Sequence, residues 1–426
     1  MKKMADARKI AVKTLLKIEK DKAYSNITLS SVFKEYDLKN EDKALVSALV
    51  YGVLDRKITL DYVLSSFMKT PLKKTAPYTL NVLRTALYQI MFMDKIPESA
   101  AVNEAVKLIK NSRESRNAGF VNAVLRAVLR ADNLLPQGNS AEDISVKYSC
   151  PLWIVESLIN DYGAEDTVLY LEESLKAPPF TVRVNTQKIS SEELACELLK
   201  DNISSKKVPG FDALVLSKGT DITGNNSFKN GLFYAQDLAS QTAIKNFCLE
   251  KGSRVLDMCA SPGGKSFSMA LAMENEGEIV SCDLYEHRVK LIKDTAERLG
   301  LDIIKPLSAD ATVFNEDLGK FDCILCDVPC SGLGVLRRKP DIKYKEAENF
   351  EELEEIQFKI LSNAVNYLKD GGKILYSTCT LRKAENEMVV NRFLKEYNGF
   401  EKIKEQTLMP QTTGTDGFYF ALLSKA

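Results

Sequence analysis

The spacing of apolar residues changes along the chain and predicts where one kind of structure gives way to another. Up to about residue 131 apolar residues recur three and four positions apart, which predicts amphipathic helices. Leu83, Leu87 and Ile90 are one example of this spacing. The stretch 132–143 then carries Pro, Gly, Asn and Ser, a composition typical of linkers. We therefore expect an all-α N-terminal domain that ends at this linker.

The rest of the chain has two further patterns. Residues 144–235 combine a helical start, the strand-like segment FTVRVNTQ and a Gly/Ser/Asn-rich stretch, which favours a small α+β domain. From about residue 250 amphipathic helices alternate with five strand candidates: RVLDM, EIVSCD, IIKPLSAD, FDCILCD and KILYSTC. This alternation predicts an α/β, Rossmann-like domain with a parallel sheet. We place the three domains at residues 1–135, 144–235 and 236–426.

Charge separates the two ends of the chain, although the total is balanced at 58 Lys and Arg against 58 Asp and Glu. The first 150 residues hold 25 basic and 16 acidic residues, a net charge of +9, which leaves −9 for the remainder. A basic segment of this kind favours a polyanion-binding module, although surface lysines alone also produce such an excess. No apolar run approaches the roughly 18 residues of a membrane span, and charges interrupt the start where a signal peptide needs an apolar core. We expect a cytoplasmic protein with no membrane partner.

The cysteines and the histidine limit the possible chemistry. Nine cysteines without regular spacing, in a chain with no export signal, indicate reduced thiols rather than disulfides. The single histidine, His287, excludes a multi-histidine metal site. Cys323 and Cys326 imitate a metal-binding pair, but their spacing in a strand directs them to opposite faces, so we expect no metal. Four others are expected to be small core hydrophobes: Cys150, Cys196, Cys248 and Cys282.

The first strand of the α/β domain leads into a glycine-rich turn. This strand ends at Asp257 and is followed by CASPGGKS and a helix, at the position where open α/β sheets bind nucleotide-like ligands. The phosphate-binding template G-x-x-x-x-G-K-[ST] needs glycine where Cys259 stands, and G-x-G-x-x-G is absent. Taken alone, the turn fits a ligand site or an ordinary connection between strand and helix.

Reactive and acidic residues gather at the ends of the strand candidates: Asp257, Asp283, Asp310, Asp327 and Cys379. Because the carboxyl ends of parallel strands share one edge of the sheet, these side chains should meet at one crevice. An acid at position 283 suits ribose hydroxyls and one at 310 suits an adenine amino group, although each could instead cap a helix. The segments DVPCSG and STCT should bring Cys330 and Cys379 to the same crevice.

These motifs together resemble a known family. LDMCASPGGKS, the two acids at 283 and 310, DVPCSGLG, LRRKPDIKY and YSTCT resemble the RNA 5-methylcytosine methyltransferases, which use S-adenosylmethionine. The match spans about residues 235–426. The first 131 residues, with DKALVSALVYGVLDRKITLDYVL and NAGFVNAVLRAVLR, look like a NusB-like RNA-binding domain. The resemblance implies methylation of carbon 5 of a cytosine in 16S ribosomal RNA by a monomer that needs no metal.

The family's residue roles carry over to matching positions. The resemblance implies that a loop holds the cofactor through Cys259, Ala260, Ser261, Pro262, Gly263, Gly264 and Lys265. It implies that Asp283 binds the ribose, that Asp310 binds the adenine and that Asp327 lies between cofactor and base. It further implies that Cys379 is the nucleophile and that Cys330 helps to release the product.

Three positions depart from the family's pattern. Ser261 stands where alanine is common, Lys339 where histidine is common, and Tyr344 where tryptophan is common. The last two affect contacts to the base or the RNA backbone. We expect the target base to be unpaired or flipped out, and to be held by the LRRKP turn and the N-terminal domain.

Two thiols suit this reaction. A thiolate that adds to carbon 6 of cytosine turns the ring into an enamine, whose carbon 5 can attack a sulfonium methyl group. A protonated Asp327 would relieve the charge that develops at ring nitrogen 3. The proton on carbon 5 must then leave, and Cys330 fits as the base, directly or through water. Spacing alone does not decide which thiol attacks.

Other functions remain compatible with the sequence. The chain could be a non-catalytic NusB-like assembly factor whose α/β domain binds a nucleotide. It could be an NTPase that uses CASPGGKS, although the cysteine at the first glycine position argues against this. It could also methylate cytosine in DNA or in another RNA.

Overall fold

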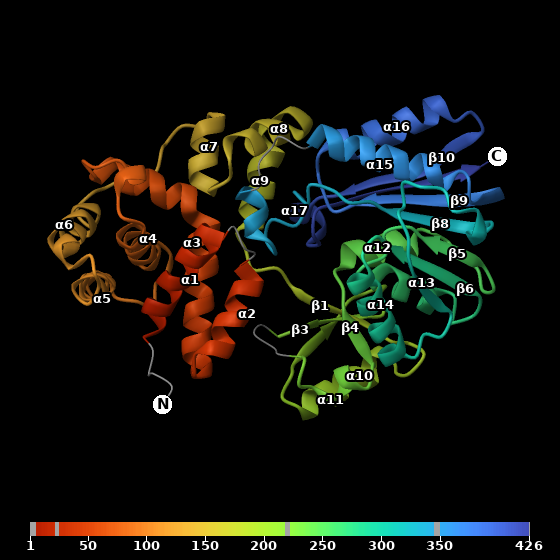
Figure 1. Ribbon diagram of the computed structural model, residues 1–426, viewed down its shortest axis with the longest axis horizontal. Helices are drawn as coiled ribbons and strands as arrows, with labels where there is room; N and C mark the ends of the chain where they lie inside the picture. The colour runs from red at the N-terminus through yellow and green to blue at the C-terminus, as the bar shows by residue number, and fades with distance from the viewer. Residues whose placement is uncertain (1–5, 22–24, 218–221, 345–349, 426) are drawn as a thin grey trace. The chain divides into compact units, whose positions relative to one another are not determined.

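The computed structural model describes residues 6–21, 25–217, 222–344 and 350–425 (Figure 1). The chain forms two compact units: residues 1–175 with 339–345, and residues 176–338 with 346–426. The sequence-based division at residues 135, 144 and 235 stays a prediction. Within the described ranges, no helix is both long and apolar enough to span a membrane.

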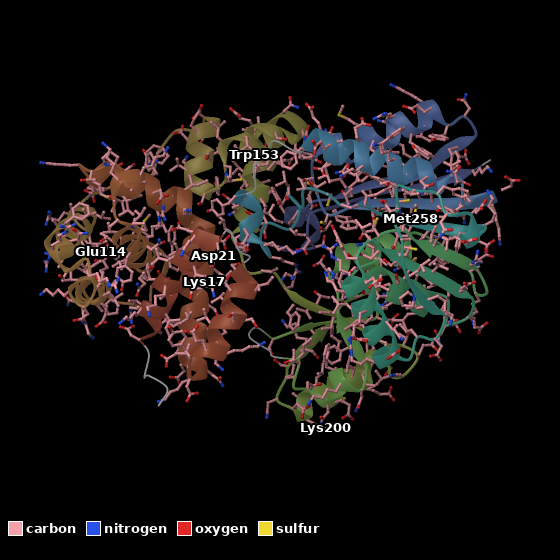
Figure 2. All side chains as sticks on the ribbon, viewed as in Figure 1. Lys17, Asp21, Glu114, Trp153, Lys200 and Met258 are labelled. Carbon is pink, nitrogen blue, oxygen red and sulfur yellow. The ribbon has the colours of Figure 1, made fainter. Side chains whose placement is uncertain are left out.

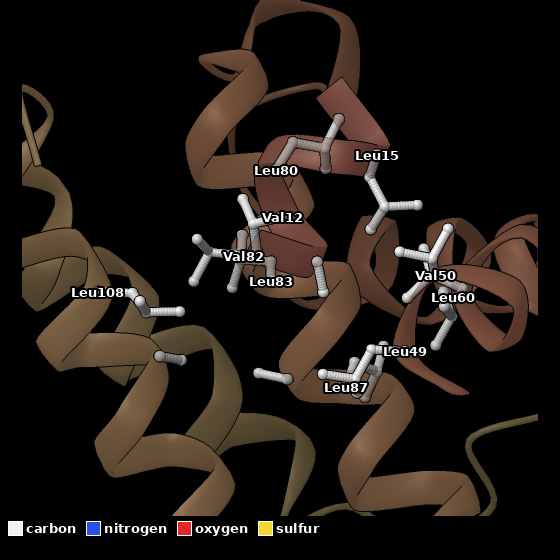
Figure 3. Packing of buried hydrophobic residues seen from close by; sticks show 14 of the residues in the cluster. Val12, Leu15, Leu49, Val50, Leu60, Leu80, Val82, Leu83, Leu87 and Leu108 are labelled. Carbon is white, nitrogen blue, oxygen red and sulfur yellow. The ribbon is translucent and has the colours of Figure 1, made fainter. Parts of the chain in front are cut away.

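The first unit is entirely helical. Its elements are α1 (Ala7–Asp21), α2 (Ser25–Glu35), α3 (Asn40–Phe67), η1 (Leu72–Lys74), α4 (Pro77–Phe92), α5 (Glu98–Lys110), η2 (Ser115–Asn117), α6 (Ala118–Val128), α7 (Ala141–Tyr148), α8 (Leu152–Tyr162) and α9 (Ala164–Ser174). Figure 3 shows its core, in which Val12 of α1, Leu49 of α3, Leu83 of α4 and Leu108 of α5 pack together. The all-helical N-terminal fold expected from the apolar spacing is confirmed.

A short segment from the C-terminal half of the sequence also belongs to the helical unit. It forms η4 (Pro340–Tyr344), and Lys343 in it has a side chain that is 0% exposed. The Lys343 ammonium donates to the backbone oxygen of Asp55 at 3.3 Å and lies 3.4 Å from its carboxylate. The Tyr344 hydroxyl donates to the carbonyl of Leu54 at 2.5 Å. This part of the LRRKPDIKY motif is therefore a packing element of the helical unit, and an RNA contact of Lys339 or Tyr344 stays a prediction.

The second unit begins with a small antiparallel sheet. Its elements are β1 (Phe180–Val184), α10 (Ser191–Lys200), β2 (Ser205–Lys207), β3 (Ala213–Leu216), α11 (Asn226–Lys229) and β4 (Phe233–Ala235). The strand order is β2-β3-β1-β4. Leu194 and Leu198 of α10 pack on Val182 and Val184 of β1, the strand expected from FTVRVNTQ. The small α+β fold is confirmed.

A seven-stranded sheet follows, in the order β10-β11-β9-β8-β5-β6-β7. Its elements are α12 (Leu238–Lys245), β5 (Arg254–Asp257), α13 (Gly264–Ala272), β6 (Glu278–Asp283), α14 (Glu286–Leu299), β7 (Ile304–Ser308), η3 (Glu316–Leu318), β8 (Phe321–Asp327), α15 (Phe350–Ala364), β9 (Leu368–Thr378), η6 (Lys383–Glu385), α16 (Glu387–Glu396), β10 (Phe400–Leu408), α17 (Pro410–Thr413) and β11 (Phe418–Lys425). The strands β5 to β9 pair in parallel, and β11 runs antiparallel to both of its neighbours. All five strand candidates form strands, so the Rossmann-like class is confirmed.

Helices cover both faces of this sheet. In Figure 1, α12, α13 and α14 lie on one face and α15 and α16 on the other. Alternate residues of one strand enter the two cores, as the two-residue period of a strand requires. Cys323 packs in the core under α13 and α14, whereas Cys326 packs in the core under α15 and α16. The sulfur of Cys326 lies 3.7 Å from that of Met258, which Figure 2 labels. The two cysteines thus lie on opposite faces. Across the described ranges, no group of three or more His, Cys, Asp or Glu side chains could hold a metal ion.

The four cysteines that were expected to be small core residues divide into two pairs. Cys150 and Cys282 are buried, as expected. The prediction for Cys196 and Cys248 was wrong, because both are exposed. Cys196 lies on α10 away from the apolar face that carries Leu194, and Cys248 follows α12 in a turn with φ of 53°. Free cysteine is usually buried, and helix phase alone would have corrected only the first of these two positions.

Replacing Lys343 by alanine should destabilise the helical unit, because the partly buried carboxylate of Asp55 would lose its cation. Burial already raises the pKa of Asp55 in spite of Lys343. We expect a loss of about 3 kcal/mol, the low end for a broken buried pair, since Asp55 keeps 27% of its side chain exposed. Urea unfolding followed by circular dichroism measures this loss. The exposed neighbour Lys339→Ala is the control, and equal midpoints for the two variants would contradict the prediction.

Candidate active site

The order of the strands reverses at the carboxyl end of β5, and we call this edge of the sheet the crevice. From β5 the chain adds β6 and β7 on one side, and then returns to add β8 and β9 on the other. Open α/β sheets bind ligands where the strand order reverses in this way. The strands β5, β6 and β8 end at Asp257, Asp283 and Asp327, Asp310 lies two residues after β7, and Cys379 follows β9 directly. The structure therefore brings the predicted site residues to one edge of the sheet.

The buried carboxylate of Asp257 holds the loop between β5 and α13 in place. Asp257 is fully buried, and its Oδ2 accepts a hydrogen bond from the Ser266 hydroxyl at 2.6 Å. The Ser266 oxygen in turn accepts from Ser281 of β6 at 2.9 Å. Gly263 has a φ of +102°, which side chains of L-residues rarely adopt, and a Cβ there would lie 2.3 Å from the ring of Phe267. These contacts explain the glycine and serine positions of the loop.

Two further acids lie on the β6–β7 side of the crevice. Asp283 accepts a hydrogen bond from the backbone N–H of Tyr285 at 3.1 Å, and Asp310 accepts from the N–H and hydroxyl of Thr312 at 2.8 and 2.7 Å. Each acid therefore uses one oxygen in a local turn. Neither is the helix cap that the sequence left open, because the N-caps of α14 and η3 are Tyr285 and Asn315. A ligand role for the carboxylates stays a prediction.

Exposed apolar side chains beside these acids were missed by the sequence reasoning. Leu284 is 53% exposed, Val313 60% and Phe314 50%. Each follows an acidic strand end by one to four residues, and that position was the only signal in the sequence. Large apolar side chains are expensive to leave in water, so these exposed positions, close in sequence to the two acids, are candidates for contact with a ligand.

The two predicted thiols are in direct contact. The sulfur atoms of Cys330 and Cys379 lie 3.2 Å apart. Their turns are also joined through the backbone, since the N–H of Gly334 donates to the Cys379 carbonyl at 2.9 Å. A Cβ on Gly334 would lie 2.0 Å from the carbonyl oxygen of Gly417, so the close approach of these segments requires glycine.

Lys265, at the start of α13, contacts Asp327 at the end of β8. Lys265 donates to Asp327 at 2.6 Å, and the Ser377 hydroxyl donates to the other oxygen of Asp327 at 2.8 Å. Burial acts to lower the pKa of Lys265, but the charge and the hydrogen bond of Asp327 and the charge of Cys379 outweigh it, and the pKa is raised. The raised pKa keeps the positive charge on Lys265. The role expected for a protonated Asp327 stays a prediction.

The two thiols have different electrostatic surroundings. The hydrogen bond to Cys379, then burial, then the charge of Cys379 raise the pKa of Cys330 well above its ordinary value. Contact with Cys379 and burial therefore both favour the protonated form of Cys330. Which of the two thiols is the nucleophile stays a prediction.

The LRRKP turn is not a free basic surface. Arg337 and Arg338 donate to the two oxygens of Asp416 at 2.8 and 2.5 Å, and Arg338 also donates to Asp237 at 2.8 Å. The Arg337 side chain is only 5% exposed. Their acidic partners lie about 80 and 100 residues away in sequence and could not be inferred from the motif. A contact between this turn and RNA stays a prediction.

The fold and the crevice define a Rossmann-like methyltransferase with a helical N-terminal unit. Comparison with protein families supports this class: residues 246–424 match the model of the 16S rRNA methyltransferase RsmB/F, and residues 5–130 match the NusB family. Residues 150–223 match the ferredoxin-like domain of RsmF/B-like methyltransferases.

Full-length relatives agree with the family models. The chain is 38% identical to the "Probable ribosomal RNA small subunit methyltransferase B" of Bacillus subtilis, over 99% of both chains. It is 31% identical to the ribosomal RNA small subunit methyltransferase B of Vibrio cholerae, over 92% of this chain and 91% of that one. A solved methyltransferase homolog from Pyrococcus horikoshii is 26% identical, with a TM-score of 0.61 over 68% of this chain and 100% of that one. The chain belongs to the RsmB/F family of 16S rRNA methyltransferases.

Replacing Asp257 by asparagine should change how stability depends on pH. Burial raises the pKa of Asp257 to about 7 in the folded protein. As pH rises from about 4 to 7, the unfolded chain loses this proton while the folded chain keeps it, so the wild type loses stability, by up to about 4 kcal/mol. The asparagine side chain is neutral in both states. Urea unfolding at pH 5 and pH 8 should therefore show Asp257→Asn gaining stability relative to the wild type at pH 8. A difference that is the same at both pH values would contradict this.

Proposed function

We propose that this protein methylates carbon 5 of a cytosine in 16S ribosomal RNA with S-adenosylmethionine, through a covalent bond between Cys379 and the base. The observation that carries the proposal is the 3.2 Å contact between Cys330 and Cys379, beside the Lys265–Asp327 pair. Family membership supports rRNA as the substrate and methyl transfer as the reaction. The two thiols support cytosine carbon 5 as the target, because this carbon needs a nucleophile at carbon 6.

The crevice has the chemistry that an adenosine group requires. The loop Cys259–Lys265 would approach the cofactor, Asp283 would accept hydrogen bonds from the ribose hydroxyls, and Asp310 one from the adenine amino group. The exposed side chains of Leu284 and Phe314 would cover the apolar face of the adenine. S-adenosylmethionine would supply a methyl group activated by the adjacent sulfonium.

Cys379 acts as the nucleophile. Its thiolate bonds to carbon 6 of the cytosine, and the electron pair of the ring double bond moves toward carbon 5 and ring nitrogen 3. Lys265 holds the proton that this step needs: it passes the proton to Asp327, which then donates a hydrogen bond to ring nitrogen 3. The 2.6 Å contact between Lys265 and Asp327 supports this relay.

Cys330 acts after methyl transfer. Once Cys379 is bonded to the ring, it carries no charge, and the interactions that most raise the pKa of Cys330 are gone. Cys330 then releases its proton to solvent more readily, and its thiolate removes the proton from carbon 5. The electron pair of that C–H bond re-forms the ring double bond and expels the Cys379 thiolate. Product release and restoration of the nucleophile therefore occur together.

The basic N-terminal unit would bind the RNA. The first 150 residues carry a net charge of +9, which favours contact with phosphates. The target cytosine must leave its stack for Cys379 to reach carbon 6, so a loop or splayed nucleotide is expected.

Replacing each thiol should stop the reaction at a different stage. Cys379→Ala should abolish methyl transfer and form no adduct, because no bond to carbon 6 can form. Cys330→Ala should accumulate a covalent protein–RNA adduct, because the proton on carbon 5 is not removed. Denaturing gels with labelled S-adenosylmethionine and 16S rRNA measure both outcomes.

The same gels contain their control and their contrary result. The control is Cys326→Ala, which removes a buried thiol of β8 one position before Asp327. A folded Cys326→Ala variant should behave like the wild type. Adducts with Cys379→Ala and none with Cys330→Ala would reverse the two roles. Bisulfite sequencing of rRNA from a strain without the gene locates the methylated cytosine, and an unchanged map would remove the 16S assignment.

Replacing Asp283 by asparagine should weaken cofactor binding. Asparagine keeps one oxygen for the N–H of Tyr285 but loses the charge that the ribose hydroxyls would contact. We expect at least about a tenfold rise in the dissociation constant for S-adenosylmethionine, the usual effect of losing a hydrogen bond to a charged group. Isothermal titration calorimetry measures it. The exposed Asp294→Asn on α14 is the control, and equal affinities in both variants would exclude Asp283 from the cofactor site.

A further inference from the structure

Two buried side chains, neighbours in sequence, contact the turns that carry the two thiols. Glu385 ends η6, and Asn386 follows it. Both residues are 0% exposed, so neither can touch a substrate. Neither had a role in the reasoning from sequence motifs.

Glu385 holds the turn of Cys330. Its Oε2 accepts a hydrogen bond from the backbone N–H of Ser331 at 2.8 Å and one from the amide nitrogen of Gln357 at 2.9 Å. The same nitrogen of Gln357 donates to the carbonyl of Pro329 at 2.9 Å. The backbone is therefore bound on both sides of Cys330, through hydrogen bonds that the carboxylate charge strengthens.

Asn386 holds the turn of Cys379. Its Oδ1 accepts a hydrogen bond from the Thr378 hydroxyl at 2.5 Å, and its Nδ2 donates to the carbonyl of Thr380 at 3.1 Å. The residues on both sides of Cys379 are therefore bound by the two halves of one amide. A hydrogen bond of 2.7 Å between the hydroxyls of Ser331 and Thr380 joins this turn to that of Cys330.

A carboxylate at position 385 suits its neighbours better than an amide. Three donors converge on it: the Ser331 N–H, the Gln357 amide and the Arg382 guanidinium, the last at 3.2 Å. An ionised carboxylate only accepts hydrogen bonds, so it satisfies all three and offsets the cost of its own burial. A glutamine would turn an N–H₂ group toward one of these donors.

We propose that Glu385 and Asn386 are positioning residues that together set the separation of the Cys330 and Cys379 sulfurs. One fixes each turn, and because they are consecutive in the chain, their spacing is set by a single peptide unit. The catalytic consequence rests on the proposed function. Displacing a reacting group by about 1 Å can cost about a hundredfold in rate.

A thiol-oxidation assay tests the separation without any methyl transfer. Diamide removes two hydrogens from adjacent thiols, which leaves one disulfide and reduces the diamide to a hydrazine. In the full-length wild type, Cys330 and Cys379 should form this disulfide readily, as measured by alkylation of the remaining thiols and peptide mass spectrometry. Glu385→Gln and Asn386→Asp should each form it at least about tenfold more slowly, because the turns are no longer held in contact.

The matched control is Glu387→Gln. Glu387 lies two residues after Glu385 and contacts Thr407, at 3.4 Å, rather than either thiol turn. In the Glu387→Gln variant, Cys330 and Cys379 should form the disulfide at the wild-type rate. Wild-type rates in both Glu385→Gln and Asn386→Asp would overturn the proposal. Loss of cooperative thermal unfolding in both would also overturn it, since the residues would then hold the fold rather than the thiols.

Steady-state methylation of 16S rRNA supplies the second measurement. In both variants kcat should fall at least about tenfold, while KM for S-adenosylmethionine and RNA stays within about twofold, because neither residue reaches a substrate. A change confined to KM would contradict a positioning role. If the wild type methylates no cytosine but the oxidation rates behave as expected, the proposed function fails and the positioning role stands.

Discussion

The contact between the sulfurs of Cys330 and Cys379 depends on the parallel pairing of β8 with β9. In that pairing Asp327, the last residue of β8, lies opposite Ser377 of β9. The two strands therefore end next to each other at the same edge of the sheet. Cys330 and Cys379 then follow their strands by three residues and one residue. A shift of the register by one residue would send alternate side chains to the wrong face of the sheet. The chemistry of the crevice therefore depends on strand register before it depends on any side chain.

Register alone does not bring two thiols to 3.2 Å, because the turns beyond the strands have no ladder to hold them. Here polar side chains take over that task. The backbone of one turn donates to the carbonyl of Cys379 through Gly334, and buried Glu385 and Asn386 bind the flanking residues. Buried polar groups of this kind are costly unless all of their hydrogen bonds are made. The burial of Glu385 and Asn386 therefore indicates that holding the two turns in place is worth the free-energy cost of burying polar groups.

Local pattern accounts for what the sequence predicted correctly. The apolar spacing of the first 131 residues and the strand ends at Asp257, Asp283 and Asp327 depend on neighbours along the chain, and they were found. The partners of Arg337 lie far along the chain, and so do those of Lys343, so the ion pairs of this basic motif could not be predicted from local pattern. Glu385 was overlooked for a similar reason: glutamate is usually exposed, and only the fold shows three donors around it.

Charge around the two thiols bears on the choice of nucleophile that position leaves open. Two thiols in contact are equivalent in sequence terms, and a symmetric environment would leave the nucleophile undefined. The surroundings are not symmetric, since the raised pKa of Lys265 owes part of its shift to Cys379, while the hydrogen bond to Cys379 and burial raise the pKa of Cys330. Under the proposed function, the interactions between the two sulfurs would disappear when Cys379 bonds to carbon 6, and Cys330 would then release its proton more readily. The order of the two proposed steps would follow from a change in charge at a single sulfur.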